Sequence, residues 1–250
     1  MKISEELWGH IPLLHVYQET MDAQTPTVIM LHGHTSAGEH NLHYAYHLVN
    51  KGIRVLLPDA LMHGKRSFES NILELNIKFW EIVMTSLKEI EEIYKIGLSK
   101  NIISENNVGL IGISMGGITA SAALTVYPWI KTAAICMGVT SVTKLAEHQL
   151  KTVKIGGQPL PLTEEHKQEI FHQLSPFNLE NKPEIFHQIP IIFWHGDQDP
   201  IVPIDYSYPF FEEQLQQSKA IYIKEKGLGH AVSRSGTLKV IDFVAQYLSD

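Results

Sequence analysis

The chain has 250 residues, of which 44% are hydrophobic and 19% charged, and its formal net charge is -7 at pH 7. This length suits one well-buried core, and the composition is typical of a soluble globular protein and excludes a disordered one. A mildly acidic chain lacks the basic surface that nucleic-acid binding requires, so we expect no nucleic-acid partner.

The sequence predicts neither a secretory signal nor a membrane span. Its first ten residues include Glu5 and Glu6 and lack an apolar core. No apolar run approaches the roughly 18 residues of a membrane-spanning helix. The single cysteine, Cys136, cannot form an internal disulfide, which is typical of a reducing compartment. We therefore expect a cytoplasmic protein.

In the first half of the chain, short β-branched apolar runs alternate with longer helical patterns, which favours βαβ units and a parallel sheet. Apolar residues recur at helical spacing from about residue 69 to 96, so one face of that helix should lie on the sheet. We interpret Phe79 and Trp80 there as core or rim packing. The predicted strands are 13–19, 27–31 and 53–57, and the predicted helices are 39–50 and 69–96.

The second half continues the same alternation with one interruption. The predicted strands are 107–111, 132–137, 189–194 and 221–224, and the predicted helices are 118–127 and 236–248. Between them, residues 138–188 contain several prolines and two or three short helical patterns. This segment is too long for a plain connection, so we expect one domain over 1–250 with a cap or lid insertion at about 138–188.

A sequence typical of a nucleophile elbow joins the strand 107–111 to the helix that follows. Residues 112–117 read Gly-Ile-Ser-Met-Gly-Gly and match G-x-S-x-G. Gly112 and Gly116 remove side chains where the two backbones cross, which presents the Ser114 hydroxyl to a substrate. The first N–H groups of the helix would lie beneath a developing oxyanion. Ser114 is therefore the candidate nucleophile.

A serine hydroxyl is a weak nucleophile, so it needs a base and a carboxylate that orients this base. Both follow Ser114 in the order Ser, Asp, His. The strand 189–194 runs into a loop that carries Asp197 and Asp199, at the edge of the sheet where catalytic groups collect. His230 lies in a glycine-containing loop before the last helix and is the candidate base. It must be neutral to accept the Ser114 proton.

Two backbone N–H groups are candidates for the oxyanion hole. Met115 directly follows the nucleophile. His34 follows the strand 27–31 by way of Gly33, which allows a close approach of the chain. This assignment uses the backbone, so the identity of the side chain at position 34 matters little.

These segments together resemble the α/β-hydrolase superfamily across essentially the whole chain. Residues 32–36 and 58–66 resemble those of small bacterial esterases in the prolyl-oligopeptidase and dienelactone-hydrolase-like branch. The resemblance implies an α/β-hydrolase fold, with a mostly parallel sheet flanked by helices, and a carboxylesterase for small esters with short acyl chains. The loop 195–203 resembles H-G-x-x-D-x-x-V-P, in which the second acid is catalytic. This favours Asp199, with Asp197 as a turn or cap residue.

Other polar residues admit more than one interpretation. His63, Lys65 and Arg66 follow the strand 53–57 and could touch the substrate or tie their loop to its neighbours. We interpret Asp59 as a turn residue. The histidines that precede a glycine at two strand ends, His32 and His195, are interpreted as stabilising loops.

The 14 histidines of the chain raise the question of a metal site, and His43 and His47 lie one helical turn apart. Neither H-E-x-x-H nor a cysteine pair accompanies them, so we expect no metal and no cofactor. Cys136 lies in an apolar strand and is interpreted as core packing.

The leading functional hypothesis is ester hydrolysis by a two-step acyl transfer on Ser114, with a small-molecule ester as the partner. One alternative is another acyl substrate, such as a thioester, a lysophospholipid or a short peptide amide, acted on by the same residues. A second alternative is a catalytically silent α/β-hydrolase fold that binds a ligand or a protein.

Overall fold

The computed structural model describes residues 1–67, 71–105, 107–152, 154–155, 157–159, 162–214 and 218–249. Within these ranges, eight strands form one sheet in the order β1-β2-β4-β3-β5-β6-β9-β10. The strand β2 runs antiparallel to β1 and β4, and the remaining pairs are parallel. The strands are β1 (Lys2–Trp8), β2 (Ile11–Tyr17), β3 (Thr27–Leu31), β4 (Arg54–Pro58), β5 (Val108–Ile113), β6 (Ile130–Cys136), β9 (Ile191–Gly196) and β10 (Ala220–Glu225).

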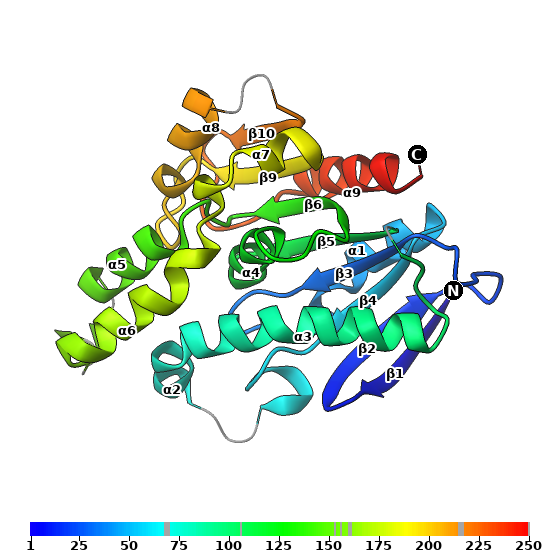
Figure 1. Cartoon of the computed structure of the whole chain (residues 1–250), viewed down its shortest axis with the longest axis horizontal. Helices are drawn as coiled ribbons and strands as arrows, with labels where there is room; N and C mark the ends of the chain where they lie inside the picture. The colour runs from blue at the N-terminus through cyan, green and yellow to red at the C-terminus, as the bar shows by residue number, and fades with distance from the viewer. Residues whose placement is uncertain are drawn as a thin grey trace.

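Helices cover both faces of this sheet (Figure 1). The helices α1 (Leu42–Asn50) and α9 (Arg234–Ser249) pack on one face, and α3 (Phe79–Ser99) and α4 (Met115–Leu124) pack on the other. The central strand β3 shows why two layers are needed, because Val28 and Met30 enter one core while Ile29 and Leu31 enter the other. All of β3 is buried, as expected for a parallel strand covered on both sides.

The predicted strands and helices are present, with shifted boundaries. Among the strands and α-helices of the described residues, four are not predicted from the sequence: β1, the short strands β7 (Lys154–Ile155) and β8 (Gln158–Pro159), and the helix α8 (Tyr208–Gln214). The inward positions of β1 include Ser4 and Glu6 and therefore carry little apolar alternation. The helix predicted at 69–96 is divided into α2 (Ile72–Ile77) and α3, because Lys78 leaves the helical conformation at ψ 9°. Its predicted start at Glu69 lies outside the described residues. The helix α4 begins at Met115, three residues before its predicted start.

The segment between β6 and β9 contributes the elements that project beyond the carboxyl ends of the strands, where α5 and α6 are seen in Figure 1. Two apolar residues of this segment, Val153 and Leu160, lie outside the described residues. The remaining elements are α5 (Val142–Thr152), β7 (Lys154–Ile155), β8 (Gln158–Pro159), α6 (Glu164–Leu174), α7 (Glu184–Gln188) and α8 (Tyr208–Gln214).

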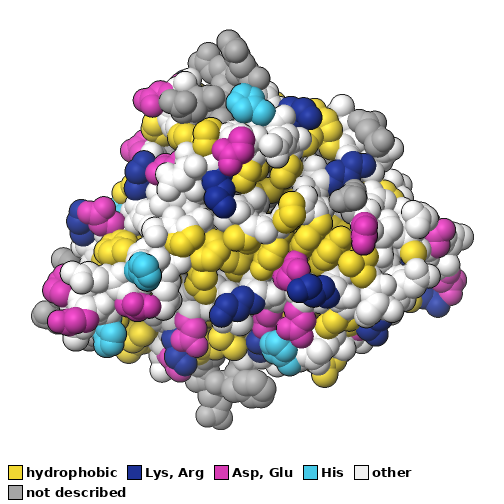
Figure 2. All heavy atoms as spheres, viewed as in Figure 1, with side chains coloured by type: hydrophobic (Ala, Val, Ile, Leu, Met, Phe, Trp, Pro, Cys, Tyr) yellow, Lys and Arg dark blue, Asp and Glu magenta, His cyan; other side chains and the backbone are white. Residues whose placement is uncertain are grey.

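Aromatic side chains pack between α3 and the start of β6. The rings of Tyr94 and Trp129 stack with centroids 4.0 Å apart, and the Trp129 indole donates to Glu91. Figure 2 shows hydrophobic side chains gathered in a band between α3 and α4 on this face.

Among the helices of the described residues, none combines the length and the apolar character needed to cross a bilayer.

Candidate active site

Ser114 occupies a strained turn between β5 and α4. Its backbone has φ 55° and ψ -116°, a conformation that a residue with a side chain adopts only when its surroundings impose it. A Cβ on Gly112 would lie 2.1 Å from the Gly116 carbonyl oxygen, and one on Gly116 would lie 2.2 Å from that of Leu31. Both positions therefore exclude any residue but glycine, and the close crossing of backbones holds the Ser114 hydroxyl at the edge of the sheet.

The side chains of Ser114, His230 and Asp199 form a chain of hydrogen bonds. The Ser114 Oγ lies 2.8 Å from His230 Nε2, and His230 Nδ1 lies 2.7 Å from Asp199 Oδ2. Because a carboxylate can only accept, Nδ1 carries the proton and Nε2 is free to accept from the serine hydroxyl. The arrangement can therefore move the Ser114 proton to an imidazole that is 23% exposed.

Asp199 is held as a buried anion by three hydrogen-bond donors and by a nearby histidine ring. Its Oδ1 accepts from the amides of Ile201 and Val202, at 2.9 and 3.0 Å. Its Oδ2 accepts from His230 and lies 3.4 Å from His195 Nε2, which also donates to the Val202 carbonyl. Burial alone would raise the pKa of the Asp199 carboxyl, but these hydrogen bonds outweigh it and keep the pKa well below its ordinary value.

The competing acid, Asp197, lies elsewhere. Its Oδ1 accepts from the Gly227 amide at 2.6 Å, which ties the loop after β9 to the turn after β10. The structure thus brings Asp199, and not Asp197, next to His230. His195, interpreted from the sequence as a loop residue, also touches the Asp199 carboxylate, a contact that sequence spacing alone does not reveal.

The two proposed oxyanion donors flank the elbow. Met115 is the first residue of α4, where backbone N–H groups point out of the helix end. A Cβ on Gly33 would lie 3.5 Å from the Ser114 Cβ, so the chain that leads to His34 passes directly beside the serine. The next amide, that of Thr35, donates to His63 Nε2 at 3.0 Å. The side chain of His34 contacts Asn76 Oδ1 at 3.0 Å and the edge of Phe79.

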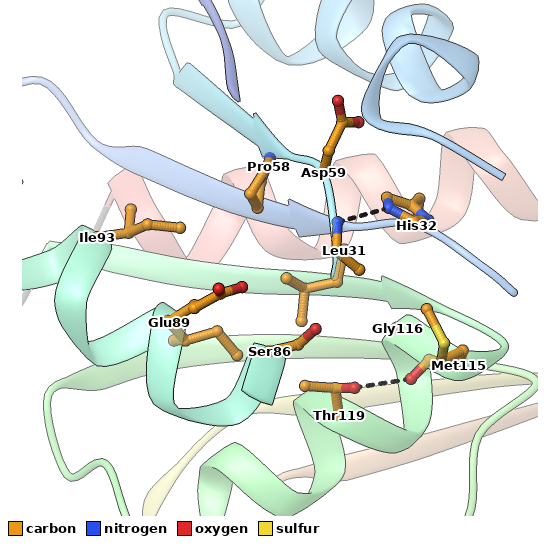
Figure 3. A pocket seen from close by; sticks show the side chains of 12 residues that line it. Leu31, His32, Pro58, Asp59, Ser86, Glu89, Ile93, Met115, Gly116 and Thr119 are labelled. Atoms are coloured by element: carbon orange, nitrogen blue, oxygen red, sulfur yellow. Dashed lines mark hydrogen bonds between the residues drawn. The ribbon is translucent and has the colours of Figure 1, made fainter. Parts of the chain in front are cut away.

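Buried polar side chains fasten the loop after β3 to the loop after β4. His32 Nε2 accepts from the Ala60 amide at 3.0 Å, and its Nδ1 donates to the Gly33 carbonyl at 2.8 Å. Asp59 accepts from the amides of Gly38 and Lys65, both at 2.9 Å. His32 and Asp59 line a small cavity of about 20 Å³ together with residues of α3 and α4, which are drawn in Figure 3. These contacts agree with the interpretation of His32 as a loop-stabilising residue and of Asp59 as a turn residue.

The basic residues of the loop after β4 bind other parts of the protein. His63 uses both ring nitrogens, since Nδ1 donates to the Leu61 carbonyl and Nε2 accepts from Thr35. Arg66 donates to Glu89 at 2.9 Å, and Lys65 pairs with Glu5. Of the two interpretations left open by the sequence, these contacts favour the one in which the residues tie the loop to its neighbours.

A cavity of about 960 Å³ opens beside Ser114 and His34. It lies between α3, the acid loop after β9, and the helices α5 and α6. Phe79 and Trp80 line it, so they do more than the packing assigned to them from the sequence. The sequence indicates this role only weakly, because, of the two residues, only Trp80 departs from the apolar spacing of the helix.

Two further expectations concern Cys136 and metals. Cys136 is fully buried, and burial raises the pKa of its thiol to about 12, so the thiol is not poised to react. Among the residues that the structure describes, no three His, Cys, Asp or Glu side chains are grouped as a metal site would require. The pair His43 and His47 lies on α1.

The sheet order, the flanking helices and the serine at a strand-to-helix elbow define a hydrolase of the α/β-hydrolase fold. Solved structures share this fold. The TM-score is 0.76 with TT1662 from Thermus thermophilus, at 17% identity over 100% of this chain and 98% of the other. It is 0.68 with Est1E from Butyrivibrio proteoclasticus, solved with ferulic acid bound, at 17% identity over 97% and 98%.

Sequence comparison narrows the class. Residues 85–250 match the prolyl oligopeptidase family. The chain is 35% identical to YitV of Bacillus subtilis (strain 168), whose name as an esterase is provisional, over 99% of this chain and 100% of YitV. It is 28% identical to esterase YjfP of Escherichia coli (strain K12), over 98% of each chain. The chain therefore belongs to the prolyl oligopeptidase family, as the sequence resemblance indicated.

Proposed function

We propose that the protein is a carboxylesterase that forms an acyl-enzyme on Ser114, with His230 as the base and Asp199 as the orienting acid. The observation that carries the proposal is the pair of hydrogen bonds from Ser114 to His230, at 2.8 Å, and from His230 to Asp199, at 2.7 Å. Relatives named as esterases that match the chain over nearly its full length support the choice of esters over other acyl compounds.

The proposed reaction has two steps. His230 Nε2 takes the Ser114 proton as Oγ attacks the ester carbonyl, and the amides of His34 and Met115 stabilise the tetrahedral oxyanion. His230 then donates this proton to the departing alcohol oxygen, which leaves an acyl group on Ser114. Water, deprotonated by His230, attacks the acyl-enzyme and releases the acid. The buried Asp199 stabilises the imidazolium formed in each step.

Two broader proposals accompany this one. The segment 138–188 acts as a cap, supported by the position of α5 and α6 beyond the carboxyl ends of the strands and by their share of the cavity wall. The protein acts in the cytoplasm, supported by a single cysteine that lies buried in the core.

Labelling with a fluorophosphonate probe tests the proposed function. We expect mass spectrometry to find one adduct, on Ser114, and the Ser114→Ala variant to lose both the adduct and the hydrolysis of p-nitrophenyl acetate. A folded protein that is neither labelled nor active would instead support the silent binding module. Higher kcat/KM on matched thioesters, lysophospholipids or peptide amides than on esters would support the other acyl hydrolases.

A further inference from the structure

The cavity beside Ser114 is larger than a short acyl group requires. Its volume is about 960 Å³, at the upper end of the roughly 300 to 1,000 Å³ typical of pockets for drug-sized ligands. An ester of a short acid and a short alcohol would leave most of this space to water. The cavity therefore points to a substrate with a second, bulky part.

The wall of the cavity is chiefly apolar and partly aromatic. Its deepest residues, Ile118, Leu174 and Val202, are at most 3% exposed and belong to the core cluster under α5 and α6. Phe79 and Trp80 add two rings set edge to face, with centroids 5.2 Å apart. Such a surface favours alkyl and aryl groups, because burying them releases water from both sides and aromatic edges pack against an aryl face.

Charged side chains stay at the rim of this cavity. Lys78 pairs with Glu74 at 3.5 Å, and the other charged residues of the wall, Glu81 and Lys88, are exposed. Among the described residues of the wall, none that is buried carries a charge. A charged group deep in this cavity would lose its hydration without gaining a partner, so the bulky part of the substrate must be uncharged.

We infer that the substrate carries a bulky, uncharged, apolar group, alkyl or aryl, that fills the cavity between α3 and α6 while its ester carbonyl lies at Ser114. This inference rests on the proposed function. If the acyl group is short, as the sequence resemblance implies, the bulky group belongs to the alcohol.

Two ester series test the inference. The first comprises the acetates of ethanol, butanol, hexanol and 2-phenylethanol, whose alcohols have similar acidity. The second comprises p-nitrophenyl acetate, butyrate, hexanoate and octanoate, which share one leaving group. We expect kcat/KM to rise at least about tenfold along one series, since each buried CH2 contributes up to about fourfold. A rise along the first places the bulky group in the alcohol, and a rise along the second places it in the acyl part and contradicts the short-acyl prediction.

Cavity-filling variants link this preference to the cavity. Ile170→Trp fills it from α6 and Thr85→Trp fills it from α3, and each should lower the ratio of kcat/KM for the preferred bulky ester to that for its smallest homologue. The matched control is Gln168→Trp, an exposed position of α6 outside the cavity wall, which should leave this ratio unchanged. Thermal unfolding and labelling of Ser114 establish that each variant is folded. Because the two substitutions lie on different helices, the test remains possible if one of the variants fails to fold.

The possible failures are distinguishable. Flat profiles in both series, with Ser114 labelled by the fluorophosphonate, overturn the inference and leave the esterase proposal standing. A rise that neither cavity-filling variant reduces, although both are folded, also overturns it. A folded protein without labelling and without hydrolysis overturns the proposed function and the inference with it.

Discussion

At the scale of single residues, Asp197 and Asp199 lie two positions apart but contact different groups. Asp199→Asn replaces a buried anion by a neutral amide. The amide oxygen can accept the hydrogen bond from His230 Nδ1, but the side chain can also turn its NH2 group toward this nitrogen. We expect the wrong imidazole tautomer to be stabilised and kcat on p-nitrophenyl acetate to fall by about 10⁴-fold, the size of loss known for such a substitution in a serine protease.

The matched control is Asp197→Asn. Its amide oxygen can still accept from the Gly227 amide, so kcat should remain near that of the parent protein. A large loss in the Asp197 variant together with a mild one in the Asp199 variant would reverse the assignment of the acid.

A second prediction at this scale concerns the stability of the fold at acidic pH. Burial lowers the pKa of His32 to about 4, and the neutral ring accepts the Ala60 amide. In the unfolded chain His32 has its ordinary pKa of about 6.5. Between these values the unfolded chain binds the proton and the folded one does not, so the stability that His32 contributes is present above about pH 6.5 and is lost as the pH falls toward 4. The full loss is on the order of 3 kcal/mol.

The variant His32→Gln isolates this contribution. A glutamine can replace both hydrogen bonds without titrating, so the free energy of unfolding should fall less between pH 7 and pH 4.5 than in the parent protein. Urea unfolding at the two pH values measures both differences. His34 and His63, whose pKa values are also lowered by burial, remain in both proteins, so the difference reports His32 together with its electrostatic interaction with His63. Equal losses in the two proteins would count against the assignment to His32.

At the scale of elements, the elbow tolerates no added atom. In Gly112→Ala the new Cβ would lie 2.1 Å from the Gly116 carbonyl oxygen, and neither backbone can move without displacing β5 or α4. We expect a loss of more than about 4 kcal/mol in the free energy of unfolding, or failure to fold. Gly52→Ala is the control. Unlike Gly112, Gly52 has a positive φ, of 82°, but its added Cβ would meet no atom within 4 Å, so this substitution should cost about 1 to 2 kcal/mol.

The same scale shows what sequence patterns can predict. Buried strands such as β3 are nearly continuous apolar runs, which predict a parallel sheet, and together with the G-x-S-x-G motif they carry the resemblance that implies the α/β-hydrolase fold. The edge strand β1 is not predicted because the positions that face inward include the polar residues Ser4 and Glu6. The start of α4 was placed too late because two glycines of low helix propensity, Gly116 and Gly117, lie in its first turn.

Some features of the candidate site are likewise predictable from the sequence and others are not. Chain order and local motifs singled out Ser114, Asp199 and His230, whose side chains the structure brings within hydrogen-bond distance. The bond from Thr35 to His63 and the cavity lined by Trp80 join segments that are distant in the chain. Such contacts depend on how loops and helices pack, and no local pattern encodes them.

At the scale of the whole molecule, the proposed site is assembled by the sheet. Ser114 and His230 are separated by 116 positions, and Asp199 comes from a third loop. Each loop follows a strand, β5, β9 or β10, and all three strands run parallel, so their carboxyl ends meet at one edge. No single βα unit holds more than one of the three side chains, so the site exists only when the sheet is complete.

This dependence predicts that the site and the fold are lost together. In increasing urea, the fraction of protein whose Ser114 reacts rapidly with a fluorophosphonate should fall with the same midpoint as the far-ultraviolet circular dichroism, because all three loops that carry the site follow strands of the same sheet. The control is the Gln168→Trp variant, whose substitution is exposed on α6. Its labelling and its circular dichroism should also share one midpoint. Loss of labelling at a clearly lower urea concentration would mean that the loops after β9 and β10 separate before the sheet does, and that the contacts of Asp199 and Asp197 are too weak to hold them.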